Sequence, residues 1–77
     1  MINLSPSNKK FFKIDSETKE EIELENVSEQ NNLLFTSMKT IVRIGDSIKV
    51  IDIDGYEEIR KVKQSSKEIF RQKIILL

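Results

Sequence analysis

The chain of 77 residues has a mass of 9.0 kDa, and a protein of this length buries only about 60 to 65% of the surface that it exposes when unfolded. Hydrophobic residues make up 38% and charged residues 34%, with two Gly and one Pro, which excludes the disordered, collagen-like and low-complexity classes. Lys and Arg number 13, as do Asp and Glu, while Cys, His and Trp are absent. Disulfides, thiolate or imidazole chemistry and the usual zinc sites are therefore excluded.

Residues 1–9 are polar and contain the one Pro, so we predict a loose N-terminal lead-in before a single small domain over residues 10–77. The start of the chain has no apolar signal core, and no window approaches the roughly 18 apolar residues of a membrane span. We therefore expect a cytoplasmic protein without membrane contact. Twelve Ile and ten Lys without a single Ala are typical of AT-rich codons, which associates the chain with a phage or mobile element in a bacterial host.

The first predicted element is a β-hairpin of residues 10–15 and 20–27. Ile22 and Leu24 alternate with Glu21, Glu23 and Glu25, which is the period of a strand with one buried and one solvated face. Residues 28–38 are mostly polar around a short apolar group, so we expect a connection that enters the core once.

A second hairpin is predicted at 39–44 and 47–53, because two β-branched runs flank Gly45 and Asp46, and Gly supplies the positive φ of a tight turn. The second run carries apolar side chains on both faces. We therefore expect its outer face to be covered by a helix or by a partner chain.

The last third of the chain allows two interpretations. At 100° per residue, most apolar positions from Tyr56 onward share one arc, which predicts an amphipathic helix with Asp54 as its cap. The alternative is a hairpin that turns at Asp54 and Gly55, with strands at 56–63 and 68–76 completing an all-β, SH3-like barrel. Our main prediction is an α+β, β-rich fold, in which two antiparallel hairpins form a small sheet covered by a C-terminal helix.

No residues form a recognisable catalytic or metal site. The carboxylates near Asp52 do not follow the spacing of a calcium loop, and the two glycines are too few for a phosphate-binding loop. The serines have no visible general base. We therefore predict that the protein is not an enzyme and uses no cofactor.

Charged and aromatic side chains provide the candidate binding residues. In a C-terminal helix, Arg60, Lys63, Lys67 and Arg71 would form a basic ridge, whereas Glu21, Glu23 and Glu25 would form an acidic strand face. One of the adjacent Phe11 and Phe12 must point away from the core and could anchor a protein partner.

The leading functional hypothesis is a non-enzymatic protein-interaction module, a small regulator or inhibitor that binds another protein. The first alternative is nucleic-acid binding through the basic ridge, which would weaken steeply with salt. The second alternative is a structural subunit of a larger assembly, such as a homo-oligomer.

Overall fold

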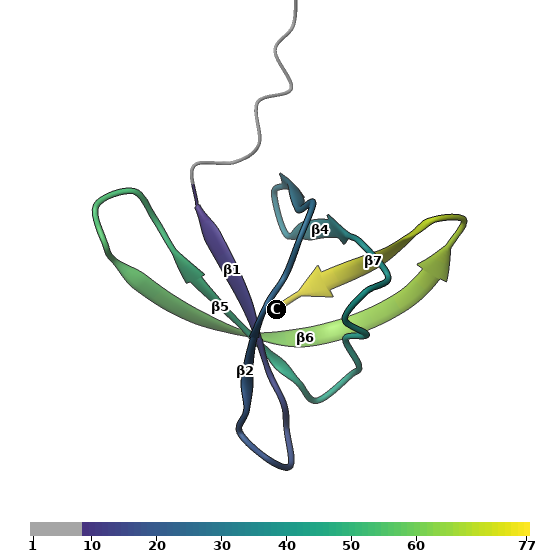
Figure 1. The fold of residues 1–77 in the computed structure, drawn as a ribbon, viewed down its shortest axis with the longest axis horizontal. Helices are drawn as coiled ribbons and strands as arrows, with labels where there is room; N and C mark the ends of the chain where they lie inside the picture. Colours follow the sequence, from purple (N-terminus) through teal and green to yellow (C-terminus); the bar gives the residue numbers. More distant parts are fainter. Residues whose placement is uncertain (1–8) are drawn as a thin grey trace, which may run out of the picture.

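The computed structural model describes residues 9–77, which form seven antiparallel strands (Figure 1). The strands are β1 (Lys10–Ile14), β2 (Glu21–Glu23), β3 (Ser28–Gln30), β4 (Leu33–Thr36), β5 (Ser47–Ile51), β6 (Glu57–Glu68) and β7 (Arg71–Leu76). Their order across the sheet is β2-β1-β5-β6-β7-β4-β3. Residues 1–8 of the predicted lead-in lie outside the described residues.

The long strand β6 belongs to both halves of this sheet. Its first part pairs with β5 and its second part with β7, so the order β2-β1-β5-β6 makes one half and β6-β7-β4-β3 the other. The register shifts between Val62 and Gln64, which leaves Lys63 as the extra residue of a β-bulge. The hairpins at the two ends of β6 extend in opposite directions (Figure 1).

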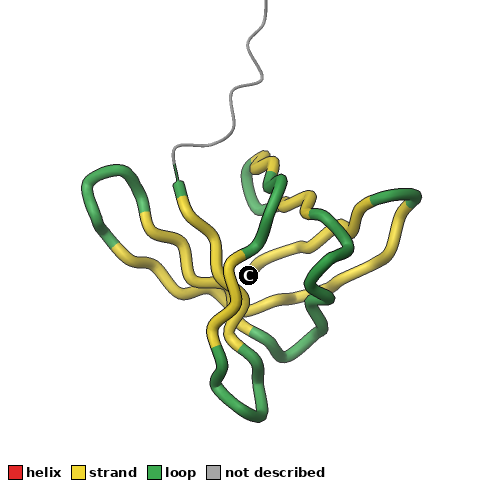
Figure 2. The backbone as a smooth tube through the Cα atoms, viewed as in Figure 1, coloured by secondary structure: helices red, strands yellow, loops and turns green. Residues whose placement is uncertain are grey.

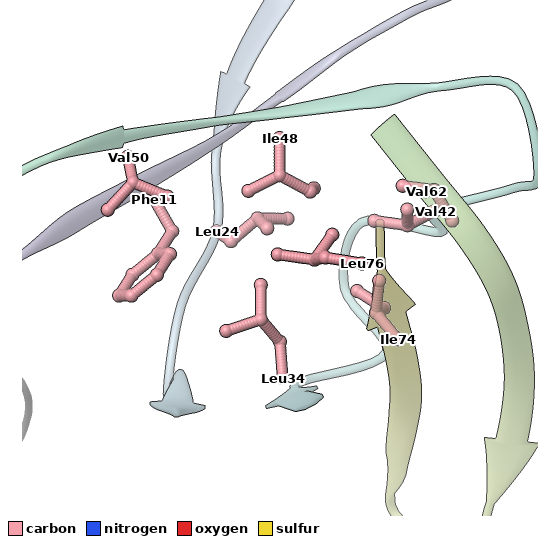
Figure 3. Packing of buried hydrophobic residues seen from close by; sticks show 9 residues of the cluster. All are labelled: Phe11, Leu24, Leu34, Val42, Ile48, Val50, Val62, Ile74 and Leu76. Carbon is pink, nitrogen blue, oxygen red and sulfur yellow. The ribbon is translucent and has the colours of Figure 1, made fainter. Parts of the chain in front are cut away.

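The hydrophobic core lies between the two halves (Figure 3). It contains one side of β1, β5, β6, β7 and β4, together with one residue from each of two connecting segments, Leu24 and Val42. Its buried hydrophobic residues are Phe11, Leu24, Leu34, Val42, Ile48, Val50, Val62, Ile74 and Leu76. Alternation along the strands brings these side chains to one face.

The predicted α+β class with a C-terminal helix is wrong, because residues 9–77 contain strands and loops but no helix (Figure 2). The bulge explains the misleading pattern. Val62 and Ser65 both face inward, three residues apart, and this spacing imitates one turn of a helix. The all-β alternative has the correct class, and residues 52–56 do form the turn between β5 and β6.

The hairpin predicted at residues 10–27 is confirmed in its centre, since Phe12 pairs with Glu23 and β2 alternates as expected. The strand predicted at 39–44 is wrong, because these residues form a loop. Residues 28–38, which we expected to be a connection, contain regular secondary structure. They include the β3–β4 hairpin, whose turn contains Asn31 at a φ of 55° and whose Leu34 is fully buried.

Candidate interaction surface

The two adjacent phenylalanines of β1 lie on opposite faces of the sheet. Phe11 is in the core, so it is not available to a partner. Phe12 is half-buried on the outer face, where the Lys49 ammonium lies 6.0 Å from the centre of its ring. We predicted that either a helix or a partner chain covers the outer face. Within residues 9–77 no helix does so.

The predicted acidic face is divided by ion pairs. Glu21 Oε1 lies 2.9 Å from Lys49 Nζ, and this hydrogen bond is the main cause that raises the pKa of Lys49. Glu25 lies beyond the end of β2 and pairs with Lys39 at 3.0 Å. Glu23 is exposed opposite Phe12. Two of the three predicted carboxylates therefore already have cationic partners.

The predicted basic ridge does not exist as one surface. Arg60 donates hydrogen bonds to the Leu77 carbonyl and to Asn32 Oδ1 at 2.7 Å. Lys63 is at the bulge, and Lys67 pairs across the ladder with buried Gln72. Arg71 lies on the other face of β7, paired with Glu68 and 4.1 Å from the centre of the Phe35 ring.

The cations nevertheless remain concentrated in the β6–β7 hairpin. Residues 60–73 contain six Lys or Arg, whereas their one acidic residue is Glu68. The other residues therefore have seven basic and twelve acidic side chains. The hairpin is positive relative to the rest of the molecule, although its cations lie on different faces.

The tip of the β6–β7 hairpin is the most exposed apolar feature of residues 9–77. Ile69 is 81% and Phe70 is 93% exposed, and they are the two residues between Glu68 and Arg71, which pair across the hairpin. The backbone of Phe70 has a φ of 70°, a left-handed conformation that is rare for a bulky residue. The sequence patterns placed Phe70 in a helix core and so missed this feature.

The tip at the other end of β6 is shaped by hydrogen bonds within the turn. Asp52 Oδ1 accepts from the N–H groups of Asp54 and Tyr56 at 2.9 and 3.0 Å, and Gly55 has a φ of 90°. Ile53 and Tyr56 are exposed here. Asp52 thus has the turn role that its sequence position indicates, and among residues 9–77 no group of three or more Asp or Glu is placed to hold a metal ion.

An open depression of about 530 Å³ lies between the loop at 41–44 and the inner side of the β6–β7 hairpin, where residues 65–67 and Gln72 line it. The loop is tied to the hairpin by two side chains. Gln72 Oε1 accepts from the Val42 N–H at 3.0 Å, and the Ser65 hydroxyl donates to the Val42 carbonyl at 2.8 Å. The β6–β7 hairpin therefore has an exposed apolar tip and also forms one side of the depression.

Comparison with protein-family models, curated proteins and solved structures found no match to this chain. In addition, no helix long and apolar enough to cross a membrane occurs among the residues that the structure describes.

Proposed function

We propose that the protein is a non-enzymatic interaction module, a small regulator or inhibitor, which binds another protein through the tip of the β6–β7 hairpin. Phe70 would enter an apolar pocket of the partner, with Ile69 beside it. The observation that carries this proposal is the 93% exposure of Phe70 at a φ of 70°. We further propose that the module acts in the cytoplasm, in a phage-infected host if the codon bias has that origin.

The backbone conformation and the exposure of Phe70 do not stabilise the fold of this chain by itself. A left-handed backbone costs a residue other than Gly roughly 1–2 kcal/mol, and an exposed phenyl ring gains little from burial. Both glycines, Gly45 and Gly55, are at positive φ, as are Asn26, Asn31 and the exposed Lys19. Phe70 is thus a bulky residue where the chain elsewhere often uses Gly or Asn, and strained residues of this kind concentrate at binding sites.

An aromatic side chain at a protruding tip is well suited to recognition. It brings a large apolar area to the partner, and its few rotatable bonds limit the entropy lost on binding. Such anchors often provide most of the affinity of an interface. A carboxylate-rich rim around the partner's pocket would complement the cations of the hairpin.

Nucleic-acid binding is the second candidate, favoured by the six cations of residues 60–73. A two-stranded ribbon fits the major groove of DNA, and Phe70 could stack on a base. However, Arg60 and Arg71 are already engaged within the chain. The twelve acidic residues outside residues 60–73 would also oppose a polyanion, so we place this function second.

The test is affinity purification of the tagged protein from its bacterial host after nuclease treatment. The wild type is compared with Phe70→Asn and with Tyr56→Ser, which removes an exposed aromatic from the opposite tip. We expect one partner to be recovered with the wild type and Tyr56→Ser but lost with Phe70→Asn. Equal recovery with Phe70→Asn, or binding that nuclease abolishes, would contradict the proposal.

A further inference from the structure

The depression beside the hairpin tip has a positive charge that the described chain does not compensate. Its ionisable lining residues are Arg43 and Lys67. Within residues 9–77, neither side chain forms a hydrogen bond or an ion pair, whereas Lys13, Lys39, Lys49 and Arg71 all have carboxylate partners. The residues among 9–77 that line the depression include no Asp or Glu. An anionic group would therefore meet two cations without ion-pair partners and no lining carboxylate that would repel it.

The same depression also offers apolar surface. Ile41 and Ile44 line it, and Ile44 is 67% exposed. The Ser65 hydroxyl and the Gln72 amide, which also line it, are occupied by hydrogen bonds to the loop. A ligand would thus meet cations and isoleucine side chains, a combination that suits a peptide with both carboxylates and aliphatic residues.

The depression is preorganised by contacts that are far apart in the sequence. Gln72 and Ser65 hold Val42, and Asp46 Oδ2 accepts from the Arg43 N–H at 2.9 Å. The backbone at Val42 and at the Arg43 N–H is therefore fixed before a ligand arrives, which lowers the entropy cost of binding. None of the described residues that line the depression is aromatic, so they offer no platform for base stacking, on which single-stranded nucleic-acid binding depends.

We propose that this depression binds an acidic segment of the partner protein, whose carboxylates pair with Arg43 and Lys67 while an aliphatic side chain contacts Ile41 and Ile44. The inference rests on the proposed function, because Lys67 lies three residues before Phe70 on the same hairpin. One partner can then contact the tip with an apolar pocket and the depression with an adjacent acidic segment.

The test uses a dye-labelled octapeptide composed of Asp, Glu and two Leu, with binding followed by fluorescence anisotropy at low ionic strength. A second peptide has Asn and Gln in place of the acids. We expect the acidic peptide to bind the wild type and to lose at least tenfold in affinity with the double variant Arg43→Glu/Lys67→Glu. The amide peptide should bind at least tenfold more weakly than the acidic peptide.

The matched control is Lys61→Glu/Lys63→Glu, which makes the same change in net charge outside the depression. It should change the affinity of the acidic peptide less than threefold, as should Phe70→Asn, and urea unfolding verifies that each variant is folded. The peptide affinity of Phe70→Asn separates the two proposals, since this substitution tests the tip and not the depression. Absence of peptide binding, an equal loss with the control, or tighter binding of a single-stranded oligonucleotide that depends on Arg43 and Lys67 would overturn the inference.

Discussion

The ammonium group of Lys13 lies 3.8 Å from Oδ2 of Asp46, and the side chains of both residues are almost completely buried. Asp46 also accepts backbone hydrogen bonds from Ser16 at 3.0 Å and Arg43 at 2.9 Å. One carboxylate therefore joins β1, the turn that follows it and the turn before β5.

We expect Asp46→Asn to lower the free energy of unfolding by about 1–3 kcal/mol, because buried Lys13 loses the more buried of its two carboxylate partners and keeps Asp15, whose Oδ2 lies 3.7 Å away. Urea denaturation measures this loss. Asp54→Asn, an exposed turn substitution, should change the free energy by less than about 0.5 kcal/mol. In a Lys13→Met background, Asp46→Asn should cost less than in the wild type, and an undiminished cost would contradict coupling between the two residues.

A second prediction concerns Gln72, which is 1% exposed and binds the loop through both ends of its amide. Its Oε1 accepts from Val42, and its Nε2 donates to the carbonyls of Ser37 and Thr40. Gln72→Leu would leave these backbone groups without their partner, so we expect a loss of about 2–3 kcal/mol in unfolding free energy. The exposed Gln64→Leu is the control, and equal stability of the two variants would refute this role.

A third prediction distinguishes two turn residues at positive φ. Phe70→Asn should raise the free energy of unfolding by about 0.5–1 kcal/mol, since Asn tolerates the left-handed region better than Phe. Gly55→Ala, where φ is 90° and no other atom crowds an added Cβ, should lower it by about 1 kcal/mol. Phe70→Leu keeps the strain and should leave stability nearly unchanged. Thermal unfolding followed by circular dichroism compares the three variants, and destabilisation by Phe70→Asn would show that Phe70 supports the fold.

A fourth prediction concerns acid unfolding. Hydrogen bonds from the backbone N–H groups of Thr18 and Glu17 to Asp15 lower the pKa of this carboxyl from its ordinary 3.8. A lowered folded-state pKa gives stability that is present above pH 3.8 and is lost as the pH falls through the folded value. Asp15→Asn should therefore show a shallower loss of stability than the wild type below pH 3.8. Urea midpoints measured from pH 2 to 6 check this, and parallel curves would contradict it.

Sequence patterns predicted the elements whose partners are near in the chain. The alternation around Ile22 and Leu24 gave the β1–β2 pairing, because that hairpin needs only a local turn and one buried face. The loop at 39–44 was mistaken for a strand, since it is fixed by Gln72, 30 residues beyond Val42. No local period indicates a contact of that kind.

The candidate site was predicted less well, because the periodicity itself changes within β6. Ile59 is exposed and Val62 is buried, so these residues do face opposite sides, as a strand requires. The bulge at Lys63 then moves the inward face to odd-numbered residues. A helical pattern tolerates that shift and also places Phe70 inside, whereas the structure exposes it at a turn.

The sharing of β6 by both halves of the sheet determines how the molecule can come apart. A half that detached would take away one hydrogen-bonding partner of β6 and open the core that both halves enclose. Residues 9–77 therefore contain no separable subdomain, and amide hydrogens near Val62 should exchange with solvent only through global unfolding. The hairpin ends carry the exposed Phe70 and Tyr56, and they can fray while this central segment stays protected. Amide exchange along this strand should therefore be slow at its middle and faster toward its two ends.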